Sequence, residues 1–313
     1  MRIRRLFTFL LILTMGLLFL NHIPIQKPVK ESPEFRFGVV ADCQYADVQS
    51  QGVREYALSD KKLKLCVEHL NVLDLKYVVS LGDLIDRNFQ SFDTVLPIVR
   101  DLEMPVYHVL GNHDYSVADK WKAEIPGKLG MPSRYYDFEV DDWRFVVLDG
   151  NDISFHAYPE DSDGYKAAAE YYKQKDFDAP EWNGAFGEKQ INWLQQVLKK
   201  ATANREKVII FCHFPVYPEN VHNLWNAGEV VQVIEKYPCV KVYMSGHNHG
   251  GNYGIKDGVH YVTMKGMVDT EENAYAVVEV FKDRLEIQGY GREKDRVMRS
   301  EEHTSELQSP SAI

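Results

Sequence analysis

Cysteine is scarce in this 313-residue sequence, and that scarcity excludes two common ways of holding a chain together. A disulfide framework needs cysteines in pairs at regular spacings, and a structural zinc site needs closely spaced cysteines or histidines. Three of the cysteines lie in or beside apolar segments typical of strands, so we expect buried free thiols, although an exported protein could pair two of them. The four cysteines are Cys43, Cys66, Cys212 and Cys239.

Positive charge is also in short supply. The sequence has 36 lysines and arginines against 46 aspartates and glutamates, a formal net charge of -10, and no basic cluster. Nucleic acids are bound mainly through clustered Lys and Arg, so no nucleic acid is expected as a partner. An acidic protein that acts on an anionic substrate needs a local source of positive charge, which bound metal ions would supply.

The first 30 residues differ in character from the rest of the chain. A basic start precedes an apolar run at residues 6–20, which is the pattern of an export signal. No A-x-A-like cleavage site follows, and residues 21–25 extend the run to about the 20 residues that span a bilayer. Residues 1–30 are therefore either a cleaved signal peptide or a membrane anchor, attached through residues 6–25. Both alternatives predict an exported protein, secreted or membrane-anchored.

The last residues, 299–313, are polar and include a segment, RSEEHTSELQS, that resembles the translation of a sequencing adapter. We treat them as a non-native or disordered tail, which would end the natural chain near Met298. Residues 31–298 are then one candidate domain, and they contain no internal repeat or low-complexity segment. Their 45% hydrophobic composition, counted over the whole chain, is enough for a sizeable core.

Short apolar segments alternate with segments of helical periodicity in this domain, which is typical of an α/β fold. From residue 260 the strands follow one another directly, which predicts antiparallel pairing. We expect a two-sheet β-sandwich flanked by helices. Strands are predicted at 35–41, 77–81, 106–110, 144–148, 208–212, 240–244, 260–264, 274–280 and 284–288. Helices are predicted at 60–73, 92–102, 188–200 and 227–236.

Residues 151–187 interrupt the alternation with a long polar segment rich in aromatic residues. Insertions of this kind often form lids or substrate walls. His156 in this segment and His222 in a later loop both lie near the expected cleft and could contact substrate, although we expect solvent exposure for both.

The residues that follow five predicted strands carry most of the chemistry. Ligands of open α/β sheets bind outside the carboxyl ends of the strands, so we expect these residues to converge in one cleft. Pairs two apart, such as Asp42 with Gln44, place both side chains on one side of an extended backbone. The motifs are Asp42-x-Gln44, Gly82-Asp83, Gly111-Asn112-His113-Asp114, His213 and Gly246-His247-x-His249.

Carboxylate, amide and imidazole ligands suit Mn²⁺, Fe²⁺ or Zn²⁺ rather than a thiolate-bound metal. Two divalent ions bring a charge of about +4, from which Asp42 and Asp83 remove two and a bridging hydroxide one more. The site would then carry about +1 and attract phosphate without a basic patch. The sequence therefore predicts a dinuclear metal centre.

In this order, the motifs resemble the calcineurin-like metallophosphoesterase superfamily, and the resemblance extends from residue 35 to about residue 298. The resemblance implies a hydrolase in which a metal-bridging hydroxide attacks phosphorus in line. Asp83 would bridge the two ions, and His113 would face the scissile phosphate, oriented by Asp114. The remaining ligands would be Asp42 and His249 on one ion and Asn112, His213 and His247 on the other.

One departure narrows the resemblance. The superfamily usually has D-x-H where this chain has Asp42-Cys43-Gln44. Glutamine at this position resembles the manganese-dependent ADP-ribose/CDP-alcohol diphosphatase family, as do ADCQYAD, GDLID, FPVYP, GHNHGG, MKGMVDT and EWNGAFGEKQINWL. That family implies cleavage of nucleoside diphosphate-linked substrates into a nucleoside monophosphate and a phosphorylated partner. Gln44 as an oxygen ligand favours manganese over zinc, although it could contact the nucleophile instead.

Several side chains beside the motifs could contact a small-molecule nucleotide substrate, because aromatic rings stack on bases. Core packing is the alternative for the aromatic ones. These candidates are Tyr45, Arg87, Tyr115, Phe214, Tyr217 and Trp225.

Two other functions stay open at this stage. One is a phosphomonoesterase or cyclic-nucleotide phosphodiesterase of the same superfamily, which a substrate panel would distinguish. The other is a non-catalytic scaffold, which should have lost several metal ligands. The oligomeric state is not predicted.

Overall fold

The computed structural model describes residues 31–175 and 179–299, where strands and helices alternate as the periodicity predicts. The first sheet contains β1 (Phe35–Val40), β2 (Tyr77–Ser80), β3 (Val106–His108), β10 (Ala274–Val280), β11 (Arg284–Gly291) and β12 (Arg296–Arg299). The second contains β4 (Tyr136–Val140), β5 (Trp143–Val147), β6 (Lys207–Phe211), β7 (Val240–Ser245), β8 (Asn252–Lys256) and β9 (Val259–Thr263). The helices are α2 (Ser59–Asn71), α3 (Ser91–Arg100), α4 (Asp119–Lys122), α5 (Ile125–Lys128), α6 (Asp163–Lys175), α7 (Glu188–Asn204) and α8 (Ala227–Ile234).

Both sheets are mixed: the first has a parallel half and an antiparallel half, and the second has a parallel centre with an antiparallel strand at each edge. The order of the first sheet is β12-β11-β10-β1-β2-β3, in which β1, β2 and β3 are parallel. The order of the second is β4-β5-β6-β7-β9-β8, with β5, β6, β7 and β9 parallel. Since parallel strands end at the same edge of a sheet, the loops after β1, β2, β3, β6 and β7 can share one cleft.

The main hydrophobic core lies between the two sheets, because alternate residues of each central strand point inward. Phe37 and Val39 of β1 belong to the same buried cluster as Phe145 of β5 and Phe211 of β6. The rings of Phe37 and Phe211 are 6.0 Å apart and meet edge to face. The sheets are therefore packed face to face as a sandwich.

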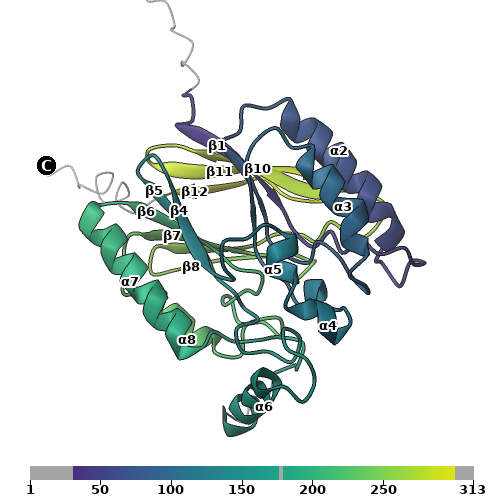
Figure 1. Cartoon of the computed structure of the whole chain (residues 1–313). Coiled ribbons are helices and arrows are strands. Elements are labelled where there is room, and N and C mark those ends of the chain that lie inside the picture. The colour runs from purple at the N-terminus through teal and green to yellow at the C-terminus, as the bar shows by residue number, and fades with distance from the viewer. Residues whose placement is uncertain (1–30, 176–178, 300–313) are drawn as a thin grey trace, which may run out of the picture. The chain divides into compact units, whose positions relative to one another are not determined.

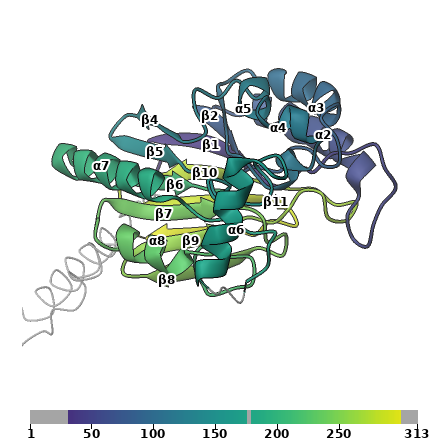
Figure 2. The same cartoon turned by 60° about the horizontal axis from the view of Figure 1, so that its bottom comes forward.

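Helices cover the two outer faces of the sandwich (Figures 1 and 2). Leu63 and Leu70 of α2 pack with Val78 of β2 in one cluster, and Leu198 of α7 packs with Ile210 of β6 in another. The amphipathic periodicity of the helices supplies these apolar stripes. This arrangement confirms the predicted α/β two-sheet sandwich flanked by helices.

Some elements differ from the prediction. The antiparallel β10 and β11 confirm part of the predicted pairing, but β9 lies in the second sheet, parallel to β7. The insertion at 151–187 contains α6, and Figure 1 places this helix beside the loops that follow the strands. Strands β4, β8 and β12 were also not predicted, and β12 includes Arg299, which was assigned to the tail. All four cysteines are free, and Cys239 is half-buried while the others are buried.

The prediction of an exported protein, secreted or membrane-anchored, is wrong on the present findings. Within residues 31–175 and 179–299, no helix is both long enough and apolar enough to cross a membrane. The segment 1–30, which motivated the prediction, lies outside the described residues, as does the proposed tail after Arg299. Export therefore has no structural support.

Candidate metal centre

Asp83 lies at the centre of the predicted cluster, in the loop after β2, and its side chain is fully buried. Its Oδ2 atom is 3.2 Å from Nε2 of His213, which follows β6. Potential ligand atoms of Asp83, His213 and His247 all lie within 4.8 Å of one another. Loops of the second sheet therefore place imidazoles beside a carboxylate from a loop of the first sheet.

Asn112, in the loop after β3, joins the same group. Its Oδ1 atom is 3.1 Å from His213 Nε2, and that nitrogen is 3.1 Å from His247 Nδ1. Asp83, Asn112, His213 and His247 thus face one point from four different loops.

Asp42, Gln44 and His249 form a second group beside the first. His249 Nε2 lies 3.5 Å from Asp42 Oδ1 and 3.1 Å from Gln44 Nε2. Gln44 Nε2 also donates to Asp83 Oδ2 at 3.0 Å, so Asp83 borders both groups. Gln44 Oε1 is buried and has no hydrogen-bond partner among the described residues. All seven predicted ligands therefore converge around Asp83.

The donor atoms fit a cation because their lone pairs face one another. His213 Nδ1 is 2.9 Å from the Leu81 carbonyl, which can only accept, so the proton sits on Nδ1. His247 Nε2 is 3.0 Å from Asn183 Oδ1, while the Asn183 amide NH₂ donates to the Val221 carbonyl. When both rings are neutral, His213 Nε2 and His247 Nδ1 are both acceptors, and a distance of 3.1 Å between them then needs a proton or a metal ion close by.

Backbone strain is concentrated at these ligands. Left-handed φ angles are uncommon for residues with a side chain, yet φ is 52° at Asp42, 47° at Gln44, 54° at Asp83 and 68° at His247. Conformations of this kind cost of order 1–3 kcal/mol each and cluster at functional sites. The loops therefore hold the ligand side chains at the expense of backbone energy.

Glycines in the motifs allow the loops to approach the ligands closely. A Cβ atom on Gly111 would lie 2.1 Å from Asp83 Oδ1, and one on Gly246 would lie 2.6 Å from Asp42 Oδ2. Neither position has room for a side chain. This explains the glycine in these two motifs, each of which lies against an aspartate from another loop.

His113 lies beside this cluster, and its side chain is 22% exposed. Its Nδ1 atom is 3.0 Å from Oδ1 of Asp86, which is buried at the end of the GDLID motif. The predicted orienting acid, Asp114, has a different environment. Its carboxylate accepts backbone N–H groups of Asp83, Leu84 and Gly111 at 2.8–3.0 Å and so ties two ligand loops together.

The charges of these groups depend on one another. Burial alone would raise the pKa of Asp83, but the neighbouring His213, His113 and His247 hold it well below its usual range. Burial would lower the pKa of His213, but the Asp83 carboxylate raises it to about 9. Burial and the Asp83 charge together raise the pKa of Asp114 to about 7. The cluster thus keeps one fully buried carboxylate ionised at its centre.

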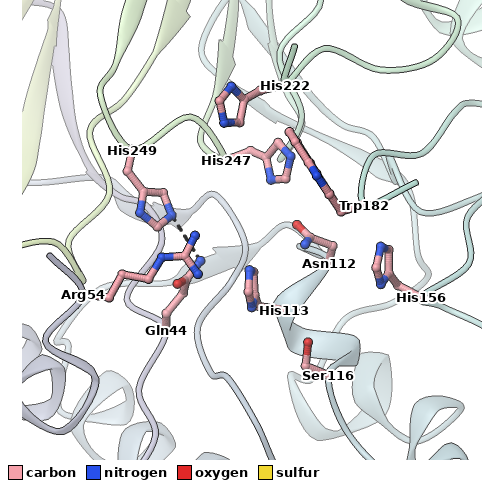
Figure 3. A pocket seen from close by; sticks show the side chains of 10 residues that line it. All are labelled: Gln44, Arg54, Asn112, His113, Ser116, His156, Trp182, His222, His247 and His249. Carbon is pink, nitrogen blue, oxygen red and sulfur yellow. Dashed lines mark hydrogen bonds between the residues drawn. The ribbon is translucent and has the colours of Figure 1, made fainter. Parts of the chain in front are cut away.

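A cavity of about 330 Å³ opens over the cluster (Figure 3). Gln44 and His249 lie on one side of it near Arg54, and Trp182 and His156 lie on the other. Its lining consists of Gln44, Arg54, Asn112, His113, Ser116, His156, Trp182, His222, His247 and His249.

The structure does not bring the six predicted substrate contacts to this cavity. In the part of the chain that the structure describes, its walls are made by other residues. Tyr115, Phe214 and Trp225 are buried, and Tyr217 lines a separate cavity together with Trp225. Arg87 pairs with Asp86, at 3.5 Å, and its guanidinium donates to Gln51 and Tyr56. Tyr45 packs against the cluster under α2 and α3.

Sequence reasoning missed Arg54, Ser116 and Trp182 as lining residues. His156 and His222 were expected to be exposed, yet both are partly buried in the lining. Burial lowers the pKa of His156 to about 4, with a further contribution from His113. Trp182 directly precedes Asn183, which contacts His247. The family-like segment EWNGAFG could therefore have been used to predict Trp182 as a lining residue.

Comparison with known proteins agrees with this geometry. The family model described as calcineurin-like phosphoesterase matches residues 35–251. A manganese-dependent ADP-ribose/CDP-alcohol diphosphatase of Arabidopsis thaliana is 34% identical over 298 residues, covering 83% of this chain and 95% of the relative. The Homo sapiens protein of the same description is 30% identical, covering 88% of this chain and 96% of the relative.

Solved structures agree as well. The crystal structure of a dimetal phosphatase from Danio rerio has a TM-score of 0.78 and 26% sequence identity. The alignment covers 86% of this chain and 100% of that chain. The similarity therefore includes the whole of the neighbour's fold.

Proposed function

Because the chain belongs to the calcineurin-like phosphoesterase family, we propose that it hydrolyses the diphosphate bond of nucleoside diphosphate-linked substrates. It is a metal-dependent hydrolase that uses two divalent ions, and manganese is favoured because its relatives are manganese-dependent diphosphatases. ADP-ribose and CDP-alcohols are the substrate types that the relatives' names give. The observation that carries the proposal is the convergence of six other carboxylate, amide and imidazole side chains around the buried Asp83.

We assign the ligands by their grouping in space. Asp83 borders both groups of donors and would bridge the two ions. When bound, the ions supply Lewis-acid polarisation of the phosphoryl oxygens and lower the pKa of water. The first ion would take Asp42, Gln44 and His249, and the second would take Asn112, His213 and His247. Gln44 would need its amide turned so that Oε1, which lacks a partner among the described residues, faces the ion.

His113 is proposed as the general acid for the leaving oxygen. The Asp86 carboxylate lies 3.0 Å from Nδ1 and would hold a proton there, which leaves Nε2 as the ring nitrogen available to substrate. Asp114 then has a supporting part, since its carboxylate fixes the backbone on which Asp83 and Leu84 lie.

Two further lining residues suit a nucleoside diphosphate. Arg54 brings a permanent positive charge to the cavity, beside Gln44 and His249 (Figure 3). Trp182, 37% exposed, presents an indole on which a base could stack. We propose that Arg54 binds the phosphate farther from the base and that Trp182 contacts the nucleoside.

A substrate panel tests the proposal. The full chain with Mn²⁺ should hydrolyse ADP-ribose and a CDP-alcohol and release a nucleoside monophosphate, measured by chromatography. Phosphomonoesters and cyclic nucleotides should react much more slowly. If they react as fast or faster, the diphosphatase assignment is refuted in favour of a phosphomonoesterase or phosphodiesterase. If no substrate is turned over with any of the metals, the non-catalytic scaffold is favoured. The complete set of candidate metal ligands argues against that alternative.

A further inference from the structure

Asp269 lies just outside the metal-ligand cluster, in the loop between β9 and β10, and contacts His249. Its Oδ1 atom is 2.8 Å from His249 Nδ1. A carboxylate can only accept, so Nδ1 carries a proton, and in the neutral ring that binds a metal ion the lone pair is then on His249 Nε2. That Nε2 is the atom that faces Asp42 and Gln44. We propose that Asp269 is a positioning residue that fixes the tautomer and orientation of His249 for the first metal ion.

The loop that carries Asp269 is held on several sides. Val268 N–H donates to the Asp42 carbonyl and Met267 N–H to the Ala41 carbonyl, both at 2.9 Å. The loop therefore moves together with the backbone of the ligand Asp42. On the other side, the Lys62 ammonium of α2 donates to the carbonyls of Met267 and Thr270. Asp269 is thus attached to the same framework as the metal site.

The His249 ring is also confined from the opposite direction. A Cβ atom on Gly266 would lie 2.6 Å from His249 Cγ, so the loop backbone packs directly against the imidazole. The Arg292 guanidinium donates to the Gly266 carbonyl and holds this part of the loop. Gly266 beside the ring and Asp269 on Nδ1 together restrict the orientation of the imidazole.

The three candidate imidazole ligands differ in their outer partners. His213 donates to a backbone carbonyl and His247 to the Asn183 amide oxygen, both of which are neutral. The outer partner of His249 is a carboxylate. A carboxylate on the outer N–H makes an imidazole a stronger ligand, and loss of such partners typically weakens metal binding by about 10–100-fold.

The negative charge of Asp269 lies beside the group of metal ligands that has fewer imidazoles. The second ion would have two imidazoles, His213 and His247, whereas the first has His249 alone with Asp42 and Gln44. Asp269 therefore strengthens the only imidazole of the first ion. This inference rests on the proposed metal centre and adds to it a residue that controls the affinity of one ion.

Asp269→Asn tests the inference, because the variant keeps the shape and an acceptor oxygen but removes the charge. Mn²⁺ binding to the full-length, metal-free protein is measured by isothermal titration calorimetry and electron paramagnetic resonance. We expect one of the two Mn²⁺ ions to bind about 10–100-fold more weakly and the other to bind as in the wild type. Asp269→Glu should recover part of the affinity.

Glu271→Gln is the matched control, since it removes one negative charge from an exposed position two residues away. Its Mn²⁺ affinities and the melting temperature of the metal-free protein should equal those of the wild type. The metal-free Asp269→Asn protein should also melt as the wild type does, which separates positioning from a structural role. If Asp269→Asn binds both ions with wild-type affinity, the inference about Asp269 is overturned and the proposed function is not. If the wild-type protein binds no Mn²⁺, both the inference and the proposed function are overturned.

Discussion

Replacing Gly111 with alanine should damage the site through one steric contact. The added Cβ would lie 2.1 Å from Asp83 Oδ1 and 2.4 Å from the Asp83 backbone nitrogen, whereas Cβ contacts essentially never fall below 3.0 Å. The carboxylate would have to move by about 0.9 Å. Asp83 Oδ1 also accepts the His113 backbone N–H at 2.7 Å, so the displacement reaches the proposed acid as well.

A misplacement of about 1 Å in a catalytic site can cost about 100-fold in rate, equivalent to about 2.7 kcal/mol of transition-state stabilisation. We therefore expect kcat for ADP-ribose with saturating Mn²⁺ to fall about 100-fold in Gly111→Ala. The assay is initial-rate kinetics, with circular dichroism to show that the variant is folded. A folded Gly111→Ala protein with wild-type kcat would refute the claim that Asp83 must keep its position.

Gly228→Ala is the matched control. Gly228 lies in α8, and a Cβ there would have no heavy atom within 4 Å. Alanine is the better helix former by about 1 kcal/mol, so this variant should be slightly more stable and equally active. The pair separates a general effect of glycine replacement from the contact with Asp83.

Three further predictions concern catalysis, acid stability and packing. His113→Ala should lower kcat by about 10²–10⁴-fold while Mn²⁺ affinity persists, as calorimetry can show; unchanged turnover would remove His113 from the mechanism. Burial lowers the pKa of His108 to about 4, so the unfolded chain binds more protons than the folded protein between pH 4 and 6.5. The free energy of unfolding should therefore fall by at most about 3 kcal/mol as the pH drops through that window. In a series of urea-unfolding experiments at different pH values, His108→Gln should make this fall smaller. Arg144, whose side chain is buried, pairs with the partly exposed Asp137, Glu139 and Glu206, so Arg144→Met should cost about 1–3 kcal/mol in urea unfolding, and an unchanged stability would refute the contribution of these ion pairs.

The candidate ligands could be predicted because they follow strands, and each strand can be recognised from the apolar pattern of its own residues. Asp83 follows β2 and His213 follows β6, so a strand prediction alone places them at one edge. Some ligand motifs also contain a glycine, such as Gly111, which can be recognised without knowing what lies far away in the sequence.

The surrounding residues could not be predicted, because their contacts depend on how distant loops fold. Asn183 and Asp269 reach the imidazoles from segments 64 and 20 residues away along the chain. Arg54 lies beyond a strand-end motif in a loop with no periodic pattern, so nothing in the local sequence marks it as a lining residue. The edge strand β4 was not predicted, although its sequence alternates with Tyr136 and Phe138 on one face.

The most direct test of the dinuclear centre is the manganese anomalous scattering of crystals grown with Mn²⁺. The account predicts two peaks about 3.5–4 Å apart, with Asp83 between them. One should lie next to Asp42 and His249, and the other next to His213 and His247. A single peak, or peaks away from Asp83, would contradict the account.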